Sequence, residues 1–229
     1  MEKQKISSAV INRLPAYLRL FSELEEKGVA HVSSNEISEL MGTTASQVRQ
    51  DFSNFGGFGR QGYGYDVKFL CEQMQTILGL DKTYNMVIVG GGKIGQALAN
   101  YGGYDKLGFY IKAVFDKEVW HVRVPSHIDV FDTDKLAEYT AKNKIDIAII
   151  CTPKEVALET AQKVKDCGIK AIWNFASQEI KLDGVHVENV HLNESLFLLT
   201  YKINSEQIWQ KNCFLDLQTG LFNMPVGCK

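Results

Sequence analysis

The sequence predicts an α/β protein in which an α-helical N-terminal domain, a winged helix, precedes a Rossmann-like parallel β-sheet. Three observations support this fold class: helix-capping signals up to residue 54, a segment rich in glycine and aromatic residues at 55–65, and apolar strands that alternate with helices after residue 85. Such alternation is typical of a parallel sheet. The expected domains are residues 1–80 and 85–204, followed by a C-terminal helix and tail over residues 205–229.

The composition is that of a globular protein. The 229 residues are 45% hydrophobic and carry a net charge of -2, which allows two domains with proper cores and gives no electrostatic indication of nucleic acid. No apolar run reaches membrane length and the first residues are polar, so we expect a cytoplasmic protein without a membrane span or signal peptide. The five cysteines have neither CxxC nor zinc spacing, so neither a disulfide framework nor a metal site is expected.

The N-terminal domain begins with two helices. Apolar residues recur at helical spacing over residues 7–27, and Gly28 follows them. Ser33 and Glu36 form a capping box for a second helix, which Gly42 ends.

A third helix follows after a short turn. Thr44 and Gln47 form another capping box, for a helix over about residues 48–54, and the short turn between the two helices is typical of a helix-turn-helix. The local pattern alone fits an ordinary helical hairpin equally well. Asp66 then caps a helix over residues 67–78.

The segment 55–65 favours DNA binding. A glycine-rich and aromatic hairpin after a recognition helix is typical of the wing of a winged helix, and Arg60 lies at its middle. The recognition helix offers polar residues that can face base edges and phosphates: Ser46, Gln47, Arg49 and Gln50. Arg49 and Arg60 would be the main cations. Arg49 could instead be a surface charge paired with Asp51.

A glycine turn joins a strand to a helix within Asn85–Asn100. Four apolar residues run directly into Gly90-x-Gly92-x-x-Gly95. Gly90 allows a tight turn, Gly92 lets the backbone approach a pyrophosphate, and Gly95 lets the helix pack closely on the strand. Backbone amides and the helix dipole would then meet the phosphates.

An acidic residue ends the next strand. Asp116 follows the apolar residues 110–115, at the distance from the turn where a ribose-binding carboxylate is expected. Such a carboxylate hydrogen-bonds the ribose hydroxyls and repels a 2′-phosphate, so the sequence favours NAD(H) over NADP(H). Lys117 weakens this preference slightly. A similar glycine turn binds CoA, and Asp116 argues against that alternative.

Strands and helices continue to alternate to residue 204. Strands are expected at residues 129–131, 145–151, 171–175 and 185–190, and helices at residues 132–143 and 153–167. Thr152 and Pro153 lie at a strand end where dinucleotides bind in such folds. Asn193 begins an amphipathic helix, and apolar residues persist beyond Ser205, which implies that this surface is covered.

Both domains resemble one family. The sequence is similar to the Rex family of bacterial redox-sensing transcriptional repressors over nearly its whole length, to about Asn204. The similarity is carried by RLPAYLR (13–19), VRQDFSNFG (48–56), FGRQGYGY (58–65), the glycine turn as far as Tyr101, and GIKAIWNFA (168–176). It implies a homodimer that binds a palindromic operator when NADH is scarce and releases it when NADH fills the Rossmann sites.

The resemblance also implies roles for single residues. It places Asn174, Phe175 and Ala176 beside the nicotinamide, although Asn174 could instead be a polar cap of its strand. It implies that the C-terminal helix is exchanged with the partner subunit. The expected NAD(H)-binding residues are Gly90, Gly92, Lys93, Ile94, Gly95, Asp116, Lys117, Thr152, Pro153, Asn174, Phe175 and Ala176. The expected DNA-binding residues are Arg13, Ser46, Gln47, Arg49, Gln50, Ser53 and Arg60.

The switch that the family implies is altered in this sequence. An aspartate is usual where His191 stands, and it is thought to exchange partners between residues matching Tyr101 and Arg19 as the nucleotide changes. A neutral imidazole can accept a hydrogen bond from Tyr101 but cannot form an ion pair with Arg19, and a protonated one repels Arg19. Gln50 and Gln61 stand where cations are common, so we expect weaker phosphate contact.

An NAD-dependent oxidoreductase with an appended helical domain is the alternative function. Such an enzyme needs a general acid or base at the nicotinamide, and only His191 is a conceivable candidate. The other histidines, His31, His121, His127 and His186, form no catalytic constellation. We therefore expect a repressor with no catalytic residues.

Replacement of His191 by aspartate is expected to sharpen the response to NADH, because a carboxylate can both accept from Tyr101 and pair with Arg19. The measurement is the NADH concentration that releases half of a bound operator from the wild-type protein and from His191→Asp, at fixed salt. Unchanged NADH sensitivity would place His191 outside the switch.

Overall fold

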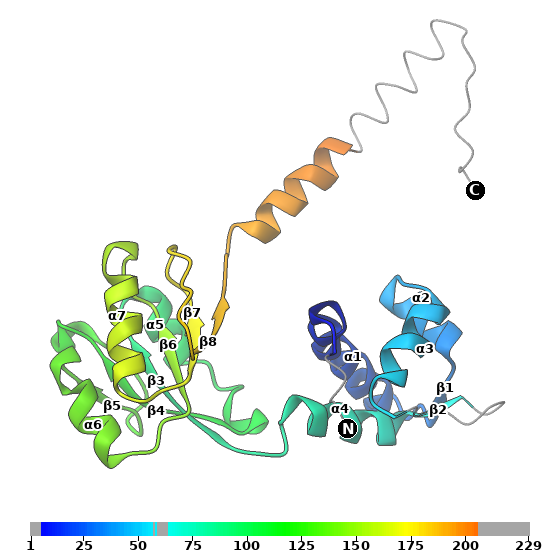
Figure 1. The fold of residues 1–229 in the computed structure, drawn as a ribbon, viewed down its shortest axis with the longest axis horizontal. Helices are drawn as coiled ribbons and strands as arrows, with labels where there is room; N and C mark the ends of the chain where they lie inside the picture. The colour runs from blue at the N-terminus through cyan, green and yellow to red at the C-terminus, as the bar shows by residue number, and fades with distance from the viewer. Residues whose placement is uncertain (1–5, 57, 59–63, 206–229) are drawn as a thin grey trace, which may run out of the picture. The chain divides into compact units, whose positions relative to one another are not determined.

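The computed structural model describes residues 6–56, 58 and 64–205, which divide into two compact units (Figure 1). The first unit holds the described residues up to Tyr84 together with Gly102–Tyr110, and the second holds Asn85–Tyr101 and the described residues from Ile111 onward. Residues 102–110 thus lie with the first unit, although the sequence suggested a domain that runs without interruption from residue 85. Each unit has its own hydrophobic core.

The first unit is built from helices around an aromatic core. Its elements are α1 (Ser8–Glu26), β1 (His31–Val32), α2 (Ser34–Met41), α3 (Ala45–Ser53), β2 (Tyr65–Asp66), α4 (Val67–Leu78) and the short 3₁₀ helix η1 (Asp105–Leu107). Strands β1 and β2 pair antiparallel. The rings of Tyr17, Phe21 and Phe52 are buried and contact one another. The predicted wing, with Arg60, falls largely outside the described residues.

Local capping chemistry fixes the helix ends of this unit. The Ser33 hydroxyl accepts the amide of Glu36 at 3.2 Å and the Glu36 carboxylate accepts the amide of Ser33 at 2.7 Å, so the first predicted capping box is confirmed. The second is only half formed. The Thr44 hydroxyl accepts the Gln47 amide at 3.1 Å, but the Gln47 side chain hydrogen-bonds Asp51 and not the backbone of Thr44.

The second unit is a six-stranded sheet in the order β5-β4-β3-β6-β7-β8. Its strands are β3 (Tyr84–Val89), β4 (Phe109–Phe115), β5 (Asp129–Phe131), β6 (Ile147–Ile150), β7 (Ala171–Asn174) and β8 (His186–Asn189). Its helices are α5 (Lys93–Ala99), α6 (Leu136–Lys142) and α7 (Lys154–Asp166), with 3₁₀ helices η2 (Val119–His121) and η3 (Thr133–Lys135). The strand order runs outward in both directions from β3 and β6, which pair in parallel. This is the topological switch point where doubly wound sheets bind ligands.

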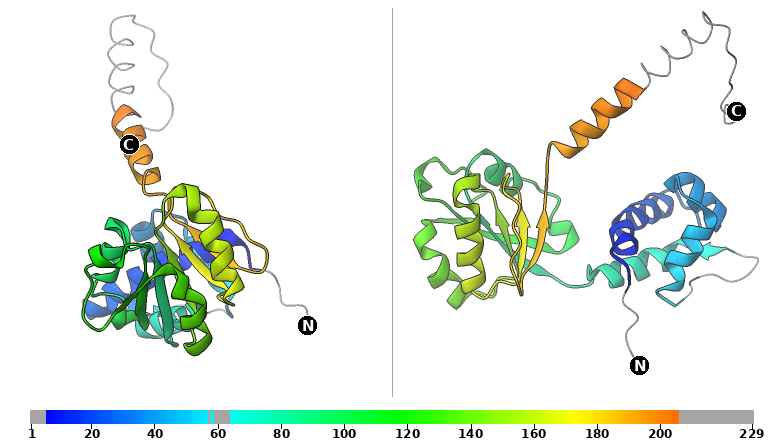
Figure 2. Two further views of the ribbon diagram at one scale, coloured as in Figure 1. Left: turned by 90° about the vertical axis from the view of Figure 1, so that its left-hand side faces the viewer. Right: turned by 45° about the horizontal axis from the view of Figure 1, so that its top comes forward.

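Helices cover both faces of this sheet, as Figure 2 shows. Val87 and Val89 of β3 belong to a buried cluster with Ala157 and Ala161 of α7. The opposite face carries Ile88, which is also buried and which lies against α5 at Gly95. Burial on both faces explains why residues 86–89 of β3 and all four residues of β6 are apolar.

A helix over residues 194–205 follows β8, and the predicted C-terminal helix and tail over residues 205–229 lie outside the described residues apart from residue 205. Among the described residues, no helix combines the length and the apolar content needed to cross a membrane.

Candidate functional site

A cleft of about 710 Å³ opens at the carboxyl ends of β3 and β6. All of its lining residues belong to the second unit. Ten of the twelve predicted nucleotide-binding residues line it: Gly90, Gly92, Lys93, Ile94, Asp116, Lys117, Thr152, Pro153, Phe175 and Ala176. The structure therefore brings together residues from loops that are far apart in the sequence.

The glycine turn at this cleft is crowded at two positions and open at one. A Cβ atom on Gly90, whose φ is +104°, would lie 2.6 Å from the carbonyl carbon of Cys151. A Cβ atom on Gly95 would collide with the carbonyl oxygen of Gly90, which explains why Gly95 is required although it does not line the cleft. A Cβ atom on Gly92 would meet nothing within 4 Å, and its φ of -71° is ordinary. Since no protein contact requires glycine there, the open position fits the approach of a ligand.

The carboxylate of Asp116 is held at the rim of the cleft by two backbone amides. The amide of Gly91 donates to Oδ2 at 2.5 Å and the amide of Glu118 donates to Oδ1 at 2.8 Å. Each carboxylate oxygen keeps further capacity to accept a hydrogen bond. A ribose diol can donate to such a group, whereas a 2′-phosphate would be repelled by it.

Thr152, at the end of β6, offers a second polar group to the cleft. Its hydroxyl oxygen is buried, and it has no hydrogen-bond partner among the described residues. A buried hydroxyl without a partner is costly, so a ligand that hydrogen-bonds it would be stabilised. The open turn at Gly92, the carboxylate of Asp116 and this hydroxyl fit the pyrophosphate and ribose of a dinucleotide.

Cys151 also lines the cleft, but it is not poised as a nucleophile. Burial raises the pKa of its thiol to about 12, so the thiol stays protonated near neutral pH.

Asn174 is not among the residues that line the cleft, and its place beside the nicotinamide stays a prediction. Its side chain is fully buried. The side-chain amide donates to the carbonyl of Gln178 at 2.7 Å and to Oδ1 of Asn189 at 2.8 Å, while its Oδ1 accepts the amide of Ala176 at 3.0 Å. Asn174 thus shapes the loop that carries Phe175 and Ala176 into the cleft. These hydrogen bonds resemble those expected if Asn174 is a polar cap at the end of its strand.

Several lining residues were not predicted from the sequence: Glu118, Thr133, Leu136, Lys154, Lys163 and Ser177 are among them. The lysines give the cleft a slight excess of positive charge, with four lysines (Lys93, Lys117, Lys154, Lys163) against three carboxylates (Asp116, Glu118, Glu159). Lys163 pairs with Glu159 at 2.8 Å. Lys163 could not be predicted from the sequence, because only the packing of α7 brings it to the cleft.

In the first unit, α3 presents one polar face outward. Ser46, Arg49, Gln50 and Ser53 are exposed, as expected of residues that contact DNA. Val48, Asp51 and Phe52, on the opposite side, are buried. Arg60 lies outside the described residues.

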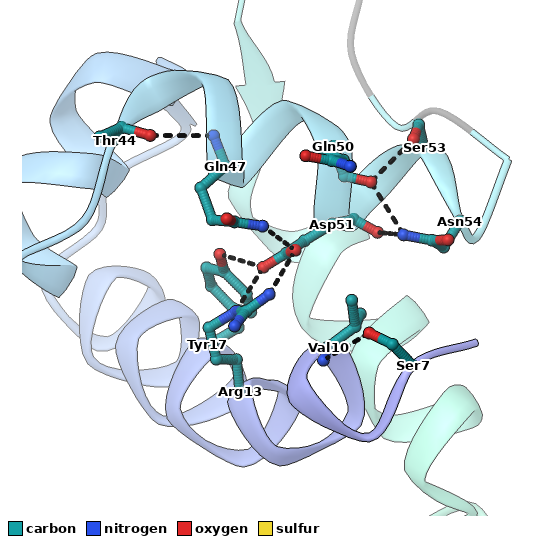
Figure 3. A network of polar contacts seen from close by, with 10 residues as sticks. All are labelled: Ser7, Val10, Arg13, Tyr17, Thr44, Gln47, Gln50, Asp51, Ser53 and Asn54. Carbon is teal, nitrogen blue, oxygen red and sulfur yellow. Dashed lines mark hydrogen bonds and ion pairs between the residues drawn. The ribbon is translucent and has the colours of Figure 1, made fainter.

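Two of the residues predicted to bind DNA, Arg13 and Gln47, are hydrogen-bonded to Asp51 (Figure 3), and their contact with DNA stays a prediction. Arg13 donates to the two carboxylate oxygens of Asp51 at 2.7 Å each, and Gln47 donates at 2.8 Å. The hydroxyl of Tyr17 donates at 2.9 Å. The Asp51 side chain is 0% exposed, whereas that of Arg13 is 31% exposed. The network therefore ties α3 to α1.

The hydrogen bonds of this network decide the charge of Asp51. Burial alone would raise the pKa of its carboxyl, but hydrogen bonds from Arg13, Gln47 and Tyr17 outweigh burial and hold that pKa below its ordinary value. The suggested pairing of Arg49 with Asp51 is wrong, since Asp51 is paired with Arg13. Arg49 instead donates to the hydroxyl of Ser34 at 2.9 Å.

The three predicted switch residues are all exposed, but they are divided between the units. Arg19 belongs to the first unit, and Tyr101 and His191 belong to the second. Their exchange of partners stays a prediction. Within the part of the chain that the structure describes, no group of three or more His, Cys, Asp and Glu residues could hold a metal ion.

Two family models match the chain. A model described as "Putative DNA-binding protein N-terminus" matches residues 5–53, and a model described as a CoA binding domain matches residues 81–178. The chain is 48% identical over 213 residues to the redox-sensing transcriptional repressor Rex of Thermoanaerobacter pseudethanolicus, covering 92% of this chain and 95% of the relative. It is 50% identical over 207 residues to the protein of the same name from Caldicellulosiruptor bescii, covering 90% and 95%.

The chain is also similar to solved structures over most of its length. The chain is similar to RSP in complex with beta-NAD+ and operator DNA, with a TM-score of 0.82, 48% identity, and coverage of 91% of this chain and 97% of that chain. It is also similar to RSP in complex with beta-NADH, with a TM-score of 0.82, 45% identity, and coverage of 91% and 98%.

Gly92→Ala is expected to weaken NADH binding at least tenfold while the thermal unfolding midpoint stays within about 1 °C of wild type, because the new methyl group meets only a bound pyrophosphate. Titration calorimetry and thermal unfolding measure the two effects. Gly95→Ala is the contrasting variant, since its methyl group strikes the backbone of Gly90 and should lower the unfolding midpoint by several degrees. Wild-type NADH affinity in Gly92→Ala would show that the pyrophosphate does not lie against this turn.

Asp51→Asn is expected to lower the free energy of unfolding by about 2 kcal/mol at pH 7, because Arg13 loses its ionised partner. The folded-state pKa of Asp51 lies below its unfolded value, so this stabilisation is fully present above about pH 4 and is lost as the pH falls through the lowered folded-state pKa. Urea unfolding at pH 7 and near pH 3 checks this, with Asp81→Asn at an exposed acid as control. An equal difference between wild type and Asp51→Asn at both pH values would contradict it.

Proposed function

The chain belongs to the Rex family of redox-sensing transcriptional repressors, and we propose that it binds operator DNA through its first unit and NAD(H) through its second. NADH releases the protein from DNA. The observation that carries the proposal is the cleft at the switch point, where Gly92, Asp116 and Thr152 offer an open backbone, a carboxylate and an unpartnered hydroxyl. The relatives bound to NAD+ with operator DNA and to NADH support both ligands.

The proposed mechanism is a thermodynamic linkage. NADH can release DNA only if it binds the DNA-incompetent arrangement of the protein more tightly than the DNA-competent one, and DNA must then weaken NADH binding by the same factor. NAD+ must discriminate less between the two arrangements. A differential of a few kcal/mol is enough for a useful shift. The dinucleotide supplies no reaction here, since its redox state is the signal.

The active form is proposed to be a homodimer on a palindromic operator in the cytoplasm. The helix over residues 194–205 exposes apolar side chains, of which Leu196 is 57%, Phe197 66% and Leu199 52% exposed. An apolar surface of this kind is normally covered in solution. A second copy of the chain is the proposed cover, and the predicted C-terminal helix over residues 205–229, which follows, is proposed to be exchanged between subunits. A twofold symmetric protein requires a twofold symmetric operator.

The two alternatives are weaker. Membership in a family of transcriptional repressors argues against an oxidoreductase, and His191, its only conceivable acid or base, does not line the cleft. The CoA binding model describes the same fold, but Asp116 suits a ribose diol and the related solved structures hold NAD+ and NADH.

A labelled palindromic operator of the family type should bind the purified protein, and NADH should release it at concentrations at which NAD+ does not. Fluorescence anisotropy at fixed salt measures both, because phosphate contacts make the affinity dependent on salt. Sedimentation of the same sample should give a dimer. DNA binding that neither nucleotide reverses would contradict the redox switch alone. Absence of DNA binding would contradict the repressor function, and a monomer bound to DNA would contradict the homodimer.

A further inference from the structure

The exposed face of α3 is a single polar stripe. Ser46, Arg49, Gln50 and Ser53 follow one another at helical spacings of three, one and three residues, and all four are exposed. This spacing places them on one side of the helix, opposite the buried Val48, Asp51 and Phe52. Any base edge that α3 reads is therefore read by this stripe.

Only part of the stripe is available to a base. The hydroxyl of Ser53 donates to the backbone carbonyl of Gln50 at 2.7 Å, which turns its proton back onto the helix. Arg49 donates one N–H to Ser34 of α2 at 2.9 Å, and the other four guanidinium donors stay available. Arg49 is the one cation in α3, which the structure describes in full.

Gln50 is the residue of the stripe that holds a donor and an acceptor side by side on separate atoms, whereas the hydroxyl of Ser46 offers both on one oxygen. Its backbone carbonyl accepts hydrogen bonds from Ser53 and Asn54, but its side-chain amide has no partner among the described residues. Figure 3 shows this side chain directed away from the cluster around Asp51. Gln47, with the same chemical group one turn earlier, has its amide bound to Asp51 at 2.8 Å. The two glutamines of α3 are thus distinguished by packing and not by chemistry.

We propose that Gln50 is a specificity-determining residue of the operator and that it selects adenine in the major groove. This proposal rests on the proposed function of DNA binding. A side-chain amide places a donor beside an acceptor, which matches N7 and the N6 amino group of adenine, whereas a lysine or arginine offers only donors and matches guanine. With Arg49 as the neighbouring cation, α3 reads a mixed half-site with an adenine assigned to Gln50.

The test is a binding selection of full-length protein against a pool of randomised DNA duplexes, with sequencing of the bound fraction. Wild type should return a palindrome with adenine preferred roughly tenfold or more at one position of each half-site. Gln50→Ala should reduce the preference at that position to below about threefold, and Gln50→Lys should move it towards guanine, with the other positions unchanged. Gln75→Ala, at an exposed glutamine of α4 outside the stripe, is the matched control and should return the wild-type palindrome.

The possible outcomes distinguish failure of the role of Gln50 from failure of the proposed DNA-binding function. A palindrome from wild type that both Gln50 variants reproduce base for base overturns the role of Gln50 and leaves the repressor function intact. The same holds if the variants change the total affinity alone, because a phosphate contact does so without altering base preference. If wild type enriches no sequence while NADH still binds, the proposed DNA-binding function fails and the assignment of Gln50 fails with it.

Discussion

The close approach of backbone segments at the glycine turn is the constraint on which the nucleotide cleft depends. Gly90 lies against the backbone that follows β6, and Gly95 lies against Gly90. A side chain at either position would push the end of β6 or the start of α5 away from β3. The contact that excludes those side chains also brings Thr152, two residues after the end of β6, to the same cleft as Asp116, directly after β4. The shape of the cleft is thus set by backbone packing, before any polar side chain contributes.

The buried carboxylate of Asp51 has a comparable role in the first unit. It accepts hydrogen bonds from Arg13 and Tyr17 of α1, so it fixes the side of α3 that faces inward. With 3.6 residues per turn, that choice also fixes the side that faces outward. Gln47 is drawn inward and Gln50 is left outside for this reason. One ionised group therefore both joins two helices and decides which face of α3 is exposed, although removing its charge from water is unfavourable by itself.

The parts of this fold that depend on local chemistry could be predicted, and the parts that depend on packing could not. Ser33 and Asp66 were correctly placed at helix starts, because a capping side chain bonds an amide only three residues away. The turn at Gly90 could also be predicted, because its three glycines lie within six residues of one another in the sequence. The direction of the Asn174 side chain could not be predicted, because its partner Asn189 lies on the neighbouring strand and pairing between strands decides which way that side chain turns. Neighbouring residues in the sequence carry no signal for such a contact.

The division of the two sites between the units limits how they can be coupled. Every residue that lines the cleft belongs to the second unit, and the polar stripe of α3 belongs to the first, so the ligands share no side chain. Coupling then requires an element that responds to the nucleotide and continues into the other unit. Helix α5 has this connectivity: it begins directly after Gly92 of the turn, and soon after its end the chain passes at Tyr101/Gly102 into the first unit. Any displacement of α5 on nucleotide binding would therefore be passed along the covalent chain at Tyr101, which is one of the predicted switch residues.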